Sequence, residues 1–536
     1  MFAKSFQMKT LAFAVMAVGS VSAHAAALDR SGQEITAFLQ DGTYAEASYT
    51  LIDANISGKD TSGNEIGDIA KRYDFFRGGV KTDVNDRWSV GVIYDQPFGA
   101  LVDYQGTNNF TGAANGVATA VIDRVTSLER QEQLTNQAVD LTQKALTAMN
   151  SGNVNEGLAY VNMAGLLGGT QQLLERVRTR LENGETPTQI AEYLTTVLPV
   201  SASVAASTVA DIQTHLASGN VSATAATEIT QNLQAYLASA TALRQAPQAL
   251  SAISSDRGRT NVEVHTHNLT GLIGYKFGQN KNVQVYGGAA LQHLTGEIHL
   301  RGNAYATATG YDAKIKSDTA PGWVAGMAYY KPEIALKAAL TYRSKIKHTT
   351  PMTEYLPLAA LNALPSDQTA MFTVETPESW NLDLQSGLSA KHKILGTLKV
   401  RYVPWSDFAV TPPLYHEASK GTVASGLNLV DYSKDQWSAD LGIAKQINDK
   451  FVVQGSLGWD SGAGNPTSTL GPIKGYYSFG LGARYNITPQ WSVSGGAKYL
   501  RFGDATSQLP DHIRQVGYFA DNDGYAVGVK FAYHQK

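Results

Sequence analysis

Residues 475–499 read GYYSFGLGARYNITPQWSVSGGAKY and contain two runs in which the side chains alternate in character. Within 477–485, every second residue is apolar or aromatic, and small or charged residues stand between them. After a break at 487–489, the alternation resumes over 491–499. Successive side chains of a strand point to opposite faces, so each run predicts a strand with one apolar face. That face covers either a protein core or lipid.

The same two-residue period recurs along the chain and predicts a large antiparallel sheet. The further runs lie at 88–95, 269–275, 334–343, 380–385, 451–459 and 525–533. Short connections are expected at 85–86, 279–281, 331–333, 391–393, 448–450 and 487–489. Longer ones are expected at 54–69, 97–261, 301–318, 348–379, 404–434, 460–474 and 503–522. Tight turns at one rim and long loops at the other are typical of outer-membrane barrels, and six short plus seven long connections predict fourteen strands.

The tryptophans indicate which way the apolar face points. Trp88 and Trp491 follow short turns, and Trp323 lies nearer the middle of a strand. The other four lie beside long loops: Trp380, Trp405, Trp437 and Trp459. Indole rings prefer the boundary between hydrocarbon and headgroups, so two aromatic belts are expected. A soluble sandwich gives tryptophans no reason to collect at strand ends. The apolar face is therefore predicted to point outward, toward lipid.

Composition and the N-terminus indicate an exported protein. Residues 1–25 have basic residues, a short apolar run over 11–19 and small residues at the end, as in a signal peptide. About nine apolar residues are too few to span a bilayer as a helix. Without Lys4 and Lys9, the 43 basic residues become 41, against 46 acidic ones, so no basic field for nucleic acid exists. The chain has no cysteine, which excludes disulfides and thiolate metal sites.

Residues 115–256 interrupt the strand pattern and predict a helical insertion in the connection after the third strand. Apolar residues recur there at helical spacing, and Thr186-Pro187-Thr188-Gln189 reads as a capped helix start. An insertion at that position lies on the outer rim. Two interpretations are open: a bundle that packs on itself, or a groove that collects ligand above the pore.

Residues 26–42 precede the first strand of a barrel that is predicted to occupy 43–536. A barrel of fourteen strands is too wide to be filled by its own wall side chains, so it needs a plug. Ile35, Phe38 and Leu39 are candidates for the apolar side of such a hatch, against ligand or wall. A disordered periplasmic tail is the alternative.

Several basic residues face the lumen according to strand parity: Arg343, Lys399, Arg401, Arg484 and Lys498. An apolar pocket with one or two cations suits an amphipathic anion, because a guanidinium holds a carboxylate through two hydrogen bonds. The alternative is a solvated charge that Asp383 or Asp440 balances.

Three motifs resemble the FadL-type outer-membrane transporters of long-chain fatty acids: ALTYRSKIK at 339–347, TPESWNLDL at 376–384 and VRYVPWSDF at 400–408. The resemblance extends over most of 262–533. It implies a fourteen-stranded antiparallel barrel with an N-terminal hatch, an inner ligand pocket and sideways release at a kinked third strand. It also implies that Arg301 is a pocket arginine.

The chain departs from that family in two respects. The usual Asn-Pro-Ala hatch motif is missing, and the helical insertion follows the third strand rather than the next outer loops. Pro97 and Gly99 end ladder pairing near the top of the third strand, where they either shape a lateral gap or begin the loop.

We therefore expect passive uptake of long-chain fatty acids or similar hydrophobic molecules. Aromatic or alkane hydrocarbons are alternative ligands, and a surface adhesin or receptor that uses its helical cap is an alternative function. The expected location is the bacterial outer membrane, as a monomer among lipid and lipopolysaccharide, with the barrel assembly machinery as a partner during biogenesis. No enzyme motif, cofactor site or nucleic-acid site is recognisable. His265 and His267 share one strand face and read as wall residues rather than a metal site.

Overall fold

The computed structural model describes residues 28–112, 256–362 and 364–535, together with residue 253 and short runs between 140 and 190. The chain divides into two compact units. The first comprises Met1–Val117, Ile253–Leu356 and Ser366–Lys536, and the second comprises Ala118–Ala252 and Pro357–Pro365. The predicted signal peptide and most of the predicted insertion at 115–256 lie outside the described residues.

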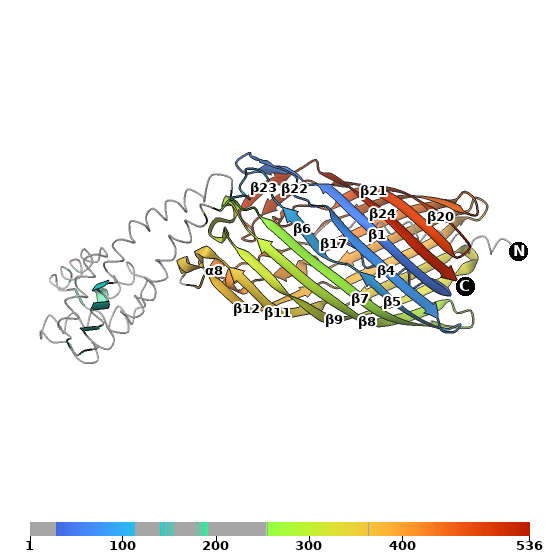
Figure 1. The fold of residues 1–536 in the computed structure, drawn as a ribbon, viewed down its shortest axis with the longest axis horizontal. Helices are drawn as coiled ribbons and strands as arrows, with labels where there is room; N and C mark the ends of the chain where they lie inside the picture. The colour runs from blue at the N-terminus through green and yellow to red at the C-terminus, as the bar shows by residue number, and fades with distance from the viewer. Residues whose placement is uncertain are drawn as a thin grey trace. The chain divides into compact units, whose positions relative to one another are not determined.

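The first unit is a closed antiparallel barrel of fourteen wall strands, as predicted (Figure 1). Eleven of these are single segments: β1 (Thr43–Asn55), β4 (Tyr73–Asp83), β7 (Asn261–Phe277), β8 (Val283–His299), β9 (Asp312–Lys331), β14 (Ile394–Val403), β17 (Gln436–Gln446), β18 (Phe451–Asp460), β20 (Tyr476–Asn486), β21 (Trp491–Phe502) and β24 (Asp523–Gln535). The other three are each built from two segments: β5 (Trp88–Asp95) with β6 (Gly99–Asp103), β10 (Leu336–Arg343) with β11 (Ile346–Tyr355), and β12 (Asp367–Thr376) with β13 (Ser379–Ser389). Pairing of β24 with β1 closes the barrel.

The long connections carry small elements of their own. A five-stranded sheet contains β2 (Gly58–Asp60), β3 (Glu65–Ile66), β19 (Thr467–Ser468), β22 (Ala505–Gln508) and β23 (Gln515–Phe519), and β15 (Ala409–Val410) pairs with β16 (Val430–Asp431). Among the described residues from 256 onward, the helical elements are α8 (Pro413–Ser419) and the 3-10 turns η1 (Asn303–Ala308), η3 (Pro357–Asn362) and η4 (Trp405–Asp407) in long connections, and η2 (Pro332–Ile334) in a short one. In the described part of the chain, no helix has the length and apolar character needed to cross a membrane.

The second unit contains the predicted helix start at Thr186. The Thr186 backbone N–H donates to Gln189 Oε1 at 2.9 Å, and the Gln189 N–H donates to Thr186 Oγ1 at 3.4 Å. These two bonds form a reciprocal cap and confirm that local prediction.

The apolar face of the wall strands points outward. Tyr477 and Leu481 on β20 are 69% and 62% exposed, whereas the alternating Ser478 is buried. On β21, Trp491 is exposed and Ser494 is buried. This is the reverse of a soluble fold, and it answers the question that residues 475–499 raise.

Outward aromatic side chains contact one another around the barrel. Trp323 packs on Tyr342 with ring centroids 5.0 Å apart, and Tyr342 packs on Trp380 at 4.7 Å. One of the seven tryptophans was wrongly predicted: Trp405 is fully buried and donates its indole N–H to Gln436 Oε1 at 2.6 Å. The Pro404 that precedes it begins η4 and ends the strand, which turns the indole away from the belt.

Two predicted loop boundaries were also wrong. The expected excursion at 348–379 contains most of β11 and β12, and the one at 97–261 contains β6. Along β11, the outward residues include Lys347, Thr349 and Thr353, so the apolar alternation ends before the strand does. The hydrophobic period therefore marks only part of each strand.

Candidate functional site

Residues 28–42 lie inside the barrel, with 31–40 buried throughout. Gly32 and Gln33 both have left-handed backbone angles, φ 63° and φ 51°, which turn the segment back on itself. Ile35, Phe38 and Leu39 are each 1% exposed and form one apolar cluster with inward residues of five wall segments: Ile93, Leu272, Tyr286, Val324, Ala328 and Ala339. One side of the segment is therefore held by hydrophobic contact with the wall.

Two glycines on the wall leave room for the ring of Phe38. A methyl group at Gly274 would lie 3.0 Å from Phe38 Cε1, and one at Gly91 would lie 2.8 Å from Phe38 Cδ2. The two glycines are on β7 and β5, which pair with each other, and together they form a recess for the ring. Tyr286 closes it with ring centroids 5.8 Å from Phe38.

The opposite side of the segment is held by ion pairs. Asp29 receives two hydrogen bonds from Arg401, at 2.6 Å from Nε and 3.2 Å from Nη2. Glu34 pairs with Arg77 at 2.8 Å and also with Lys399. Burial by itself would raise the pKa of Glu34, but the ammonium of Lys399 and the guanidinium of Arg77 outweigh it and hold that pKa well below its usual range. The segment is thus apolar toward β5–β10 and ionic toward β14 and β4.

A cavity of about 40 Å³ adjoins the ionic side, which is room for about three water molecules. The cavity is lined by three acidic residues, Glu34, Asp383 and Asp440, and by three basic ones, Lys399, Arg401 and Lys498, so the numbers of acidic and basic side chains are equal. Lys498 pairs with Asp440. The cavity is too small to hold a long apolar ligand.

Arg343 is an inward cation with two open donors. It is 3% exposed, and its Nη1 donates to Thr270 Oγ1 at 3.2 Å. Its Nε and Nη2 have no hydrogen-bond partner among the described residues. These two groups form one edge of the guanidinium, the edge that binds a carboxylate through parallel hydrogen bonds.

Register places Arg343 beside the buried N-terminal segment. It is the last residue of β10 and lies opposite Ser379 of β13. Ser379 Oγ donates to Gln33 Oε1 at 2.7 Å, and Arg401 Nη2 donates to the same oxygen at 3.2 Å. The open guanidinium edge therefore lies where residues 28–42 meet the wall.

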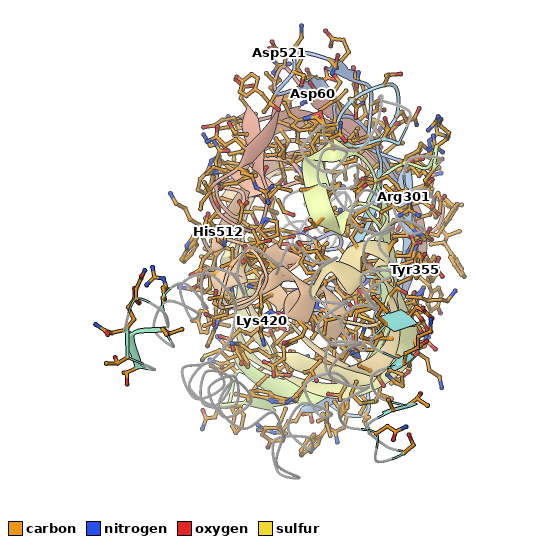
Figure 2. The ribbon with its side chains drawn as sticks, turned by 90° about the vertical axis from the view of Figure 1, so that its left-hand side faces the viewer. Asp60, Arg301, Tyr355, Lys420, His512 and Asp521 are labelled. Carbon is orange, nitrogen blue, oxygen red and sulfur yellow. The ribbon has the colours of Figure 1, made fainter. Side chains whose placement is uncertain are left out.

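Two other predicted pocket cations, Arg301 and Arg484, have different surroundings. Arg301 lies in the connection after β8, at the end of the barrel that faces the viewer in Figure 2, and pairs with Asp256 at 2.6 Å and Asp312 at 2.8 Å. Arg484 donates to Asn486 at 3.0 Å, next to a short turn. The structure thus brings Arg343 and Arg401 together and leaves Arg301 and Arg484 elsewhere.

The wall is incomplete between β4 and β6. The β4–β5 ladder ends at Gly78 opposite Tyr94, and the next contact between these neighbours is the isolated bridge of Ala70 with Val102. Between those points β6 pairs only with β7. Gly99 does not begin a loop, because it is the first residue of β6 and lies opposite His265. We call the stretch without backbone pairing, 72–77 facing 95–100, the wall break.

Two groups fill the wall break. The N-terminal arm, residues 28–30, bonds to its edge: Arg30 N–H donates to Pro97 O at 2.8 Å and Gly99 N–H donates to Leu28 O at 2.9 Å. The ring of Tyr73 lies against Gly99, where a methyl group would be 2.4 Å from the Tyr73 hydroxyl oxygen. Closure of the break therefore depends on the same segment that fills the barrel.

Sequence reasoning missed Asp29, Glu34 and Tyr73 as site residues. The two carboxylates precede a barrel with several inward cations, and that charge match was the available signal. Nothing in the local pattern distinguishes Tyr73 from the chain's other tyrosines, because its role depends on Gly99 of a different strand.

Comparisons with known proteins agree with this fold. The family model described as "Outer membrane protein transport protein (OMPP1/FadL/TodX)" matches residues 227–535, more than half of the chain. A crystal structure of a Pseudomonas aeruginosa FadL homologue is 12% identical, with 95% of each chain covered and a TM-score of 0.53. The Ralstonia pickettii toluene transporter TbuX is 10% identical, with 98% of this chain and all of that one covered and a TM-score of 0.47. No curated protein matches.

The family is assigned because its model matches more than half of the chain. The likeness to the Pseudomonas aeruginosa FadL homologue shows that the two proteins share the barrel fold. The matched residues include every wall strand from β7 to β24. The chain belongs to the OMPP1/FadL/TodX family of outer-membrane transport proteins.

Proposed function

We propose that this protein takes up long-chain fatty acids or similar amphipathic carboxylates passively across the bacterial outer membrane. The observation that carries the proposal is the buried Arg343, whose Nε and Nη2 have no partner among the described residues. A buried guanidinium without a partner is costly, so a ligand carboxylate that completes it gains a charge-assisted pair. A purely hydrocarbon ligand would leave those donors unsatisfied.

In this proposal, residues 28–42 are the hatch. Ile35, Phe38 and Leu39 occupy the space beside Arg343 when ligand is absent, and the chain of the ligand replaces them when it binds. Release is sideways through the wall break at Pro97 and Gly99, after the N-terminal arm leaves that edge. Capture at the outer surface belongs to the helical insertion at 115–256, and residues 1–25 are removed on export.

The test compares two ligands of equal chain length. Cells that express the full chain take up a radiolabelled fatty acid or the matching n-alkane, and Arg343→Met is compared with wild type and with Arg484→Met. Loss of a charge-assisted hydrogen-bonded pair, worth about 1.5–3 kcal/mol, predicts roughly 10- to 100-fold slower acid uptake in Arg343→Met and unchanged alkane uptake. Arg484→Met should match wild type for both.

Three outcomes contradict the proposal. Unchanged acid uptake in Arg343→Met, with alkane or aromatic uptake in wild type, points to a hydrocarbon channel. Equal loss of both ligands means that Arg343 is only structural. Retained uptake after deletion of 115–256, together with lost surface binding, points to an adhesin or receptor.

A further inference from the structure

Three histidines lie on the outer face of the wall, and the proposed function gives them no role. His265 and His267 are on β7 at outward positions, in line with Leu269, which is 48% exposed. His293 on β8 lies directly opposite His267, with ring centroids 6.5 Å apart. In the described part of the chain, no group of three or more side chains is arranged to hold a metal ion.

The cluster marks the boundary between apolar and polar wall. Below it, the outward residues Leu269 and Leu291 are exposed and apolar, and above it come Glu263 and Glu297. This is the level at which hydrocarbon gives way to headgroups. Ionisable side chains at that depth on a membrane protein are uncommon and suggest a site.

The cluster also borders the wall break. His265 lies opposite Gly99, and the ring of Tyr73 stacks on His265 at a centroid distance of 6.2 Å and an angle of 15°. The guanidinium of Arg30 also lies over the Tyr73 ring, 5.5 Å from its centroid. A guanidinium and an imidazole therefore both contact the ring that fills the break.

Hydrogen bonds fix the proton on His267. Gln96 Oε1 accepts from the Phe76 backbone N–H at 3.1 Å, so the other amide atom of Gln96 is its NH₂ group. That NH₂ lies 3.2 Å from His267 Nδ1, and the Tyr94 hydroxyl lies 2.7 Å from the same nitrogen. Because an NH₂ group only donates, Nδ1 is the acceptor and the proton is on Nε2. His267 therefore offers an Nε2–H donor that has no partner among the described residues.

The rings of the two neighbouring histidines are also held by polar contacts. His293 Nδ1 lies 2.9 Å from Thr319 Oγ1, and His265 Nε2 lies 2.9 Å from Glu263 Oε1. Each ring is thus held through one nitrogen by a neighbouring polar group. Held rings lose little conformational freedom when a ligand binds, which favours binding.

We propose that His267, with His265 and His293, forms an exit-side binding site for the carboxylate of the transported ligand. The inference rests on the proposed function, because it needs an amphipathic acid that leaves through the wall break. Such an acid comes to rest with its chain in hydrocarbon and its carboxylate at headgroup level, beside these imidazoles. Arg343 inside, Arg30 at the break and His267 outside then give the carboxylate a hydrogen-bond donor at each stage of its path.

The experiment replaces the three histidines together, His265→Leu, His267→Leu and His293→Leu, in the full chain in cells. Uptake of a radiolabelled fatty acid and of the matching n-alkane is measured. Loss of one hydrogen bond to a charged group predicts acid uptake at least about tenfold slower, while alkane uptake stays at the wild-type rate. Thr349→Val is the matched control, since it removes an exposed outward hydroxyl on β11, away from the break, and should change neither rate.

A conservative variant separates chemistry from structure. His267→Gln keeps an N–H donor at about the position of Nε2, so it should retain more acid uptake than His267→Leu. Equal rates for these two variants overturn the proposal, as does equal loss of acid and alkane uptake in the triple variant. If wild type takes up acid and the triple variant does so equally fast, this inference fails alone. If wild type takes up no acid, the proposed function fails with it.

Discussion

Arg343 and Arg401 are the same residue type, both point into the barrel, and their partners give them opposite roles. Arg401 is bound through two nitrogens to Asp29, which lies 372 residues away in the chain. A buried pair of this kind is strongly held because each charge satisfies the other. Arg343 has one hydrogen bond, to Thr270, and an open edge. The first arginine therefore holds the N-terminal segment, and the second remains available for a ligand.

Replacing Arg401 should release the N-terminal segment. Arg401→Met leaves the carboxylate of Asp29 buried without a cation, which costs about 3–5 kcal/mol. We expect ion conductance of the variant in planar bilayers to exceed that of wild type. The double variant Arg401→Met with Asp29→Asn removes both charges and should return conductance toward the wild-type value. Equal leakage from the single and double variants would show that the pair does not hold the segment.

At the scale of elements, residues of the candidate site lie where the wall strands are interrupted. Three wall strands are broken, at residues 96–98, 344–345 and 377–378. Pro97 and Pro377 lie in two of these breaks, and proline has no N–H to give to a ladder. Arg343 is the last residue before the second break, and Ser379 is the first residue after the third. Local loss of pairing frees backbone and side chains to face the interior.

A disulfide between the segment and the wall should stop transport. A methyl group at Gly79 would lie 3.1 Å from Ala37 Cβ, so a shift of about 0.5 Å gives the usual Cβ separation of a disulfide. The chain has no cysteine, so Ala37→Cys with Gly79→Cys introduces one defined bond. We expect uptake to fall to background under oxidising conditions and to recover after reduction, and each single-cysteine variant to be insensitive. Full uptake by the oxidised double variant would mean that the segment need not move.

At the scale of the whole molecule, polarity is inverted with respect to a soluble protein. Large apolar side chains such as Tyr477 and Leu481 are exposed, whereas Arg77 and Lys530 are buried. Ion pairs make much of the charged interior tolerable: Glu46, for example, lies 3.2 Å from Arg77 and 3.4 Å from Lys530. Hydrocarbon takes the place of a protein core on the outer face, and ion pairs hold the inner one.

Quenching of tryptophan fluorescence tests this orientation. Six of the seven indoles are exposed on the outer face and should be quenched by brominated lipids, whereas Trp405 is buried within the protein. Trp405→Phe should therefore remove fluorescence that the lipids cannot quench, so the quenched fraction rises. Trp437→Phe should lower that fraction. The opposite pair of results would place Trp405 in lipid.

Much of the fold was predictable because it depends on local pattern. A two-residue period, six tight turns and the spacing of tryptophans predicted fourteen strands and the direction of their apolar faces, and the structure confirms both. Prediction failed along β11 and β12, where the strands continue but outward residues such as Thr349 are polar. It failed again at Trp405, where a turn after Pro404 reverses the direction of the side chain.

The roles of the inward cations were not predictable, for a different physical reason. Strand parity places Arg343, Arg401 and Arg484 in the lumen, but it says nothing about which carboxylate each one meets. The partner of Arg401, Asp29, comes from a distant part of the chain and becomes its neighbour only when the barrel closes around residues 28–42. Alternation along a strand is a short-range property and can be read in order, whereas the pairing of buried charges depends on contacts across hundreds of residues. The wall strands thus follow from the amino-acid order, and the open edge of Arg343 follows from the closed barrel, in which Glu34 and Asp29 pair with Arg77 and Arg401 instead.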